Sequence, residues 1–255
     1  MHICVCIKRV PLLGSAIILT EDAASIDTAR LGFTVSPHEE CAVEAAVRLV
    51  EEHGGTITLL CLGPADAAEQ LREQLAIGPD RAILLQVDGE ADPQATASLI
   101  AQAIEQDVAA TGEPYDLILL GSESADTAGY QTGIRIAHRL GLPIVTNAKG
   151  LSVADGQVTC ERVAGSAREV YQVALPAVVT TKDGLNVPRY PSVPGRIKAR
   201  KKPIDVHEVT APVARLEKVR LSVPVSEAKG AQDLGTGAPA AARLVDVIRE
   251  IGVLQ

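Results

Sequence analysis

The chain has 255 residues, of which 47% are hydrophobic and 2% aromatic, and its formal net charge is −8. A chain of this length buries a large core without disulfide or metal staples. The few aromatic side chains and the acidic balance argue against a nucleic-acid reader, which needs stacking faces and basic surface. No apolar run approaches the roughly 18 residues of a membrane span, and the start has no signal-peptide pattern. We therefore expect a soluble, cytoplasmic protein without a transmembrane segment.

The first 145 residues alternate short apolar runs with helical patterns. Ser36-Pro37-His38-Glu39 predicts a helix start, with Ser36 as N-cap, Pro37 in the first turn and Glu39 completing a capping box. Strands are expected at 3–7, 56–61, 81–86 and 116–120, and helices at 37–53, 66–77, 93–108 and 131–140. Strands separated by helices predict βαβ units and an α/β fold with a doubly wound, mostly parallel sheet.

The alternation of apolar runs and helical patterns ends after residue 145. Residues 158–163 and 169–173 predict a hairpin, followed by one more buried strand at 177–181. Residues 182–202 read as a loop, and 203–237 as extended chain with a strand-like piece at 219–225. A short helix at 239–251 has an apolar face made of Leu244, Val247, Ile248 and Ile251. We therefore expect a nucleotide-binding domain, residues 1–202, and a C-terminal arm, residues 203–255, that packs against another chain.

Ligands of an open parallel sheet bind outside the carboxyl ends of its strands. The loop after the fourth strand, residues 121–133, is rich in small residues and ends at a helix start whose free N–H groups suit a phosphate. An ordinary glycine-rich turn would have the same composition. The five cysteines and five histidines show no metal-ligand spacing, and no catalytic constellation is recognisable.

Charge is concentrated in residues 182–202, which hold seven basic residues and one acidic residue, a local charge of +6 on an acidic protein. Such a patch suggests electrostatic docking of an acidic partner. A merely solvated basic face is the alternative.

Several motifs in this chain resemble one family. They are Ile7-Lys8-Arg9-Val10-Pro11, Gly63-Pro64, Ile77-Gly78-x-Asp80-Arg81-Ala82, Gln131-Thr132-Gly133, Leu175-Pro176-Ala177-Val178-Val179-Thr180 and Leu185-Asn186-x-Pro188-Arg189-Tyr190-x-Ser192-x-Pro194. In this order, and over nearly the whole chain, they resemble the β subunit of electron transfer flavoproteins.

The resemblance implies a non-enzymatic electron carrier. An α subunit would bind most of a redox-active FAD, while the β subunit holds a structural AMP and completes the FAD cleft. The heterodimer would accept electrons from flavin-dependent dehydrogenases of the acyl-CoA type, as in fatty acid β-oxidation, and pass them to a quinone oxidoreductase and the quinone pool. The flavin would carry the redox chemistry and the protein its binding and electrostatics.

Matching positions imply two sets of site residues. The AMP pocket would comprise Cys6, Ser36, Leu62, Asp126, Gln131 and Thr132, with His38 replacing an aromatic residue that faces the flavin in the family. The docking segment would present Val193, where the family usually has Leu, among Arg189, Tyr190, Lys198 and Lys201. Alternatively, Val193 fills a small core beneath the loop. Ser36 and Tyr130 also depart from the family pattern, in which both positions are usually Asn.

Two other functions are open. Bifurcating relatives carry a second FAD in place of AMP, but their loop typically ends in Val-Gly, so Gln131-Thr132-Gly133 favours the AMP form. A stand-alone adenine-nucleotide-binding regulatory or stress protein would need neither the docking segment nor the arm.

Overall fold

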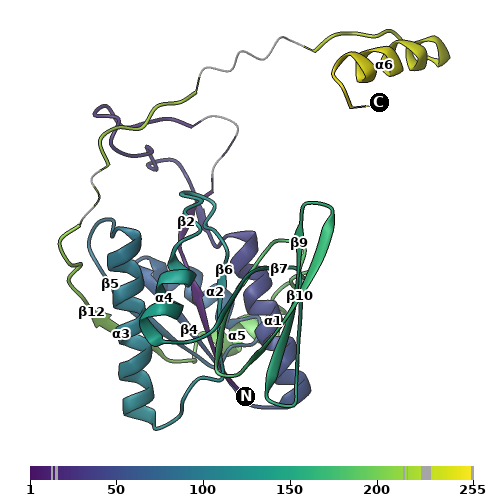
Figure 1. Cartoon of the computed structure of the whole chain (residues 1–255). Coiled ribbons are helices and arrows are strands. Elements are labelled where there is room, and N and C mark those ends of the chain that lie inside the picture. The colour runs from purple at the N-terminus through teal and green to yellow at the C-terminus, as the bar shows by residue number, and fades with distance from the viewer. Residues whose placement is uncertain (13, 15–16, 215, 217, 225–230, 254–255) are drawn as a thin grey trace. The chain divides into compact units, whose positions relative to one another are not determined.

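The computed structural model describes residues 1–12, 14, 17–214, 216, 218–224 and 231–253. The chain divides into two units, residues 1–220 and residues 221–255 (Figure 1). Within the described part of the larger unit, a seven-stranded sheet has the order β12-β5-β4-β1-β6-β11-β7, and its neighbouring strands all pair in parallel. These strands are β1 (His2–Ile7), β4 (Thr56–Gly63), β5 (Arg81–Gln86), β6 (Leu117–Gly121), β7 (Ile144–Ala148), β11 (Ala177–Thr181) and β12 (Ile204–Glu208).

Helices cover both faces of this sheet and create two cores. On one face, α1 (Pro37–His53) and α2 (Ala67–Leu75) pack with Ile3, Val5 and Ile7 of β1. On the other, α3 (Pro93–Thr111) and α4 (Thr132–Leu140) pack with Cys4 and Cys6. Figure 1 shows α1 and α3 on opposite sides of the sheet. Burial on both faces explains why the strands read as continuous apolar runs, and the predicted doubly wound fold is confirmed.

Two smaller antiparallel sheets join the larger unit. One has the order β10-β9-β8 and is built from β8 (Gly150–Ala154), β9 (Gln157–Ala164) and β10 (Ala167–Ala174). The predicted hairpin is its β9–β10 pair, whereas β7 and β8 were not predicted. The other consists of the two-residue strands β2 (Val10–Pro11) and β3 (Phe33–Thr34).

Two expectations for the second half of the chain are wrong, and one strand was not predicted. Residues 182–202 are not all loop, because α5 (Val193–Ala199) begins at the N-cap Ser192, whose hydroxyl accepts the Gly195 N–H at 3.1 Å. Within the extended residues 203–237, the edge strand β12 beside β5 was not predicted. The strand expected at 219–225 is absent at 219–224, while Val225 lies outside the described residues.

The smaller unit contains the predicted terminal helix, α6 (Ala238–Glu250). None of its described residues is buried, and Leu244 and Ile251 of the expected apolar face are 48% and 67% exposed. The predicted domain boundary at residue 202 and the contact of the arm with another chain remain predictions. Among the described residues, no helix combines the length and the apolar character needed to cross a bilayer.

Candidate functional site

The strand order reverses around β1, with β4 on one side and β6 on the other. Cys6 lies near the carboxyl end of β1, in register with Leu60 of β4 and Leu120 of β6. Leu62 is half-buried near the end of β4. The hydrogen bond with Cys4 and burial raise the pKa of the Cys6 thiol, which is therefore protonated and fills space rather than acting as a nucleophile. Open α/β sheets bind their ligands where the strand order reverses, as it does here around β1.

Two long-range polar contacts bring the predicted AMP residues together at this edge. Ser36, the N-cap of α1, accepts a hydrogen bond from the Ala125 N–H at 3.0 Å. Asp126 Oδ2 accepts from Lys8 Nζ at 2.7 Å. Burial alone would raise the pKa of Asp126, but Lys8 outweighs it and the pKa lies below its ordinary value. Asp126 is therefore a carboxylate at neutral pH.

Two buried polar atoms at this edge lack a protein partner. They are Asp126 Oδ1 and His38 Nδ1, and both remain unsatisfied within the described structure. The His38 Nε2 atom lies 3.6 Å from Glu123 Oε1, while burial lowers the pKa of the imidazole. A neutral imidazole and a free carboxylate oxygen can exchange hydrogen bonds with a polar ligand such as a nucleotide.

The other two predicted AMP residues, Gln131 and Thr132, lie at the start of α4. Its N-cap residue Gln131 provides no side-chain cap, because Oε1 instead accepts from Arg135 at 3.2 and 2.9 Å. The free N–H groups at Thr132 and the next residues thus lack a capping side chain, as a phosphate site requires. Ala128 and Tyr130, in the preceding loop, have positive φ values of 45° and 54°, a conformation that non-glycine residues keep only where the surroundings impose it.

The predicted docking segment exposes its apolar side chains. Tyr190 is 95% exposed and Val193 is 72% exposed, so the alternative that Val193 fills a core beneath the loop is wrong. Ile197, one helical turn after Val193, is 58% exposed and extends the same apolar surface. Lys198 and Lys201 are also exposed, whereas Arg189 is half-buried in ion pairs with Glu44 and Glu51.

Comparisons with known proteins identify the family. The model of the electron transfer flavoprotein domain matches residues 24–212. The electron transfer flavoprotein subunit beta of Syntrophomonas wolfei is 34% identical over 231 residues, which cover 90% of this chain and 88% of that protein. The chain belongs to the electron transfer flavoprotein β-subunit family.

Further relatives are similar at the same level. The electron transfer flavoprotein subunit beta of Bacillus subtilis is 34% identical over 197 residues, covering 74% of this chain and 75% of that protein. A protein of Acetobacterium woodii named caffeyl-CoA reductase-Etf complex subunit CarD is 34% identical over 209 residues, covering 81% of this chain and 78% of that protein.

The sequence did not indicate the surroundings that the fold gives to three charged residues of this β-subunit family member, Lys8, Glu39 and Glu44. Lys8 holds Asp126, 118 positions away, and no local pattern indicates that pair. Glu44 is buried beneath the docking segment although it looks like an ordinary polar helix position. Glu39 was predicted as a helix cap, and its Oε2 does accept the Ser36 N–H at 3.3 Å, but its burial was not foreseen.

Glu39 should make stability depend on pH. Burial raises its pKa to about 8, despite hydrogen bonds from the backbone of Lys8 and Ser36. Between about pH 5 and 8 the folded protein keeps this proton and the unfolded chain has lost it, so the free energy of unfolding falls as pH rises, by at most about 1.4 kcal/mol per unit. Glu39→Gln removes this contribution, and urea unfolding of both proteins across that range should show a flatter profile for the variant. Parallel profiles would contradict the buried, protonated Glu39.

Proposed function

We propose that this chain is the β subunit of a heterodimeric electron transfer flavoprotein, an electron carrier and not an enzyme, acting in the cytoplasm. The observation that carries the proposal is the strand-end cluster of Ser36, Asp126 and Lys8, whose Asp126 lies on the loop that leads to the uncapped start of α4. It offers hydrogen-bonding groups and, at the start of α4, free N–H groups that suit a phosphate, which supports a subunit that holds a nucleotide for structure.

The nucleotide assigned to this cluster is AMP. The free carboxylate oxygen of Asp126 and the backbone around Ser36 suit the polar edges of a nucleoside, while the N–H groups at Thr132 suit its phosphate. Cys6 and Leu62 would provide apolar walls at the strand ends. A second FAD at this place is the competing assignment, and it distinguishes the bifurcating type of the family.

The redox group of the complex is an FAD held mainly by an α subunit. When bound, this flavin supplies the electron-accepting and electron-donating chemistry. The β subunit would contribute one wall of its cleft, with the neutral, largely buried His38 at the position where relatives place an aromatic side chain. The terminal arm, whose helix exposes apolar residues, would pack on the α subunit.

The electron donors are flavin-dependent dehydrogenases of the acyl-CoA type, and the acceptor is a quinone oxidoreductase. Exposed Tyr190, Val193 and Ile197, next to Lys198 and Lys201, form an apolar centre with a basic rim. This layout suits a transient contact with an acidic partner that has an apolar pocket. The similarity to a subunit of a caffeyl-CoA reductase-Etf complex supports a partner enzyme that acts on CoA esters. Because a reductase receives electrons, this relative also fits the bifurcating alternative.

Co-expression with the α subunit tests this function. We expect a yellow heterodimer whose FAD is bleached when it is mixed with an acyl-CoA dehydrogenase and that enzyme's acyl-CoA substrate. The chain expressed alone should be colourless, because its matched motifs provide only one wall of the flavin cleft. FAD bound stoichiometrically to the lone chain, or heterodimer flavin that stays oxidised, would contradict the assignment.

A further inference from the structure

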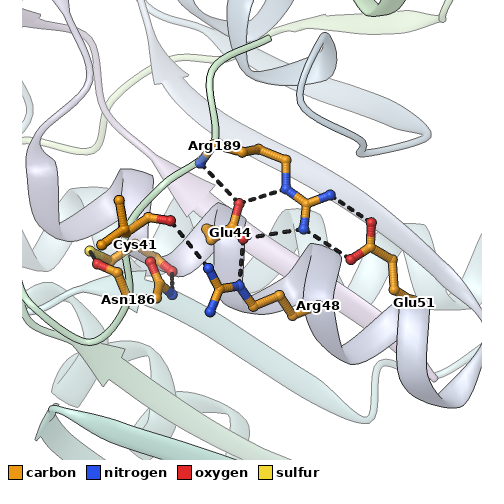
Figure 2. Close-up of polar contacts among 7 residues, drawn as sticks. Cys41, Glu44, Arg48, Glu51, Asn186 and Arg189 are labelled. Atoms are coloured by element: carbon orange, nitrogen blue, oxygen red, sulfur yellow. Dashed lines mark hydrogen bonds and ion pairs between the residues drawn. The ribbon is translucent and has the colours of Figure 1, made fainter. Parts of the chain in front are cut away.

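The N-terminal end of the docking segment, residues 186–202, is held by one face of α1. This face consists of Cys41, Glu44, Arg48 and Glu51, spaced by three, four and three residues, so that the four side chains line one stripe of the helix. Figure 2 shows their contacts with the segment. Asn186 Nδ2 donates to the Cys41 carbonyl at 2.9 Å, and Arg48 Nη2 donates to the Val187 carbonyl at 3.2 Å.

Glu44 is the centre of this contact. Its side chain is 2% exposed and accepts hydrogen bonds from the Arg189 backbone N–H at 3.2 Å, from Arg189 Nε at 2.9 Å and from Arg48 Nε at 2.5 Å. Arg189 also donates hydrogen bonds from Nη1 and Nη2 to the two carboxylate oxygens of Glu51, at 2.6 and 2.9 Å (Figure 2). Burial alone would raise the pKa of Glu44, but the two arginines reverse the shift and keep the carboxylate charged. Planar, bidentate pairs of this kind fix geometry as well as energy.

The C-terminal end of the segment is held by α2. Lys202 Nζ donates to the carbonyls of Leu75, Gly78 and Pro79 at 3.0, 3.0 and 2.5 Å. In the opposite direction, Arg72 Nη1 donates to the carbonyls of Ala199 and Lys202 at 2.5 and 2.6 Å. The two cations thus satisfy the carbonyl groups of Leu75 and Ala199, the last residues of α2 and α5, where intrahelical partners are lacking.

Two of the six basic residues in the docking segment are therefore occupied internally. Arg189 and Lys202 fix the ends, while the large apolar side chains exposed between them are Tyr190, Val193 and Ile197. We propose that Glu44, Arg189 and the α1 face are positioning residues that hold the docking segment ready to receive the dehydrogenase, so that Arg189 acts through the segment and not as a contact to the partner. The inference rests on the docking role proposed above. A segment already fixed loses less conformational freedom on association.

The test uses the FAD-loaded heterodimer as electron acceptor of an acyl-CoA dehydrogenase. Arg189→Gln and Glu44→Gln should raise the KM for the heterodimer about fivefold or more and leave kcat within about twofold, because docking and not electron transfer is impaired. The matched control is Lys198→Gln, which removes an exposed charge. It should reduce the dependence of KM on ionic strength, whereas Arg189→Gln should leave that dependence unchanged.

Hydrogen exchange provides a second readout on the same heterodimers. The backbone amide of residue 189, which donates to Glu44 at 3.2 Å, should exchange faster in Arg189→Gln than in the wild type, and at the wild-type rate in Lys198→Gln. If Arg189→Gln lowers the salt dependence as Lys198→Gln does, or if it changes neither KM nor exchange, the positioning role is wrong. The comparison with Val193→Glu separates the two proposals. If that variant alone raises KM, docking stands and positioning fails; if it also leaves KM unchanged, docking itself is wrong and positioning fails with it.

Discussion

Val193→Glu should slow reduction of the heterodimer by an acyl-CoA dehydrogenase at least about tenfold, a loss of about 1.4 kcal/mol of transition-state stabilisation. Val193 is 72% exposed at the first turn of α5, between the exposed Tyr190 and Ile197. A carboxylate at the centre of this apolar surface would have to be desolvated on docking and would oppose an acidic partner. Stopped-flow bleaching of the flavin at subsaturating heterodimer measures the effect.

The substitution should leave the heterodimer itself intact. Because the side chain is exposed, FAD content and melting temperature should equal those of the wild type within error. Val193→Ala is the matched control, since it removes apolar contact without adding a charge, and should give a smaller loss. Unchanged reduction kinetics in Val193→Glu, or loss of the folded heterodimer, would contradict the docking role.

Gly133→Val should deprive the protein of its AMP and destabilise it. A Cβ at Gly133, in the first turn of α4, would lie 2.5 Å from Thr180 Cγ2. Thr180 cannot move easily, because its hydroxyl pairs with Ser122 at 2.9 Å and accepts the Asn147 N–H at 3.1 Å. The start of α4 must therefore shift away from β11. Overpacking of this kind costs about 1–3 kcal/mol, and losing a nucleotide present at a hundredfold over its Kd costs about 2.7 kcal/mol more.

Chromatography of the nucleotides released from the heterodimer by acid, together with its melting temperature, checks this prediction. The matched control is Gly129→Ala in the preceding loop, where a Cβ would meet no atom within 4 Å and φ is not in the left-handed region. That variant should keep both its AMP and its stability. A full complement of AMP in Gly133→Val would show that the start of α4 does not form part of the nucleotide site.

The sequence predicted what local patterns encode. Apolar runs separated by helical patterns gave the parallel sheet, and Ser36 and Pro37 located the start of α1. α5 was missed because Pro194 and Gly195 look like loop residues, although a proline in the first turn suits a helix start. β12 was missed because its exposed, mixed residues gain their strand character from pairing with β5.

The candidate nucleotide site was likewise predictable only in part, because its long-range contacts depend on the fold. Motif matches placed Ser36 and Asp126 at the strand ends, yet their partners Ala125 and Lys8 emerge only from the fold. Arg189 was interpreted as a docking charge because it stands in a basic run, and its pairing with Glu44 spans 145 positions. Such ion pairs cannot be predicted from neighbouring residues in the sequence, because they depend on the topology that places α1 beneath the docking segment.

We propose that this chain is a β subunit that holds AMP and that the FAD belongs to its heterodimer with the α subunit. The most direct measurement is the nucleotide content of the heterodimer purified with its α subunit, with released nucleotides separated by chromatography and counted against protein. We expect one FAD and one AMP per heterodimer. Two FAD and no AMP would indicate the bifurcating type, and a heterodimer with one FAD but no adenine mononucleotide would contradict the role assigned to the Ser36–Asp126 cluster.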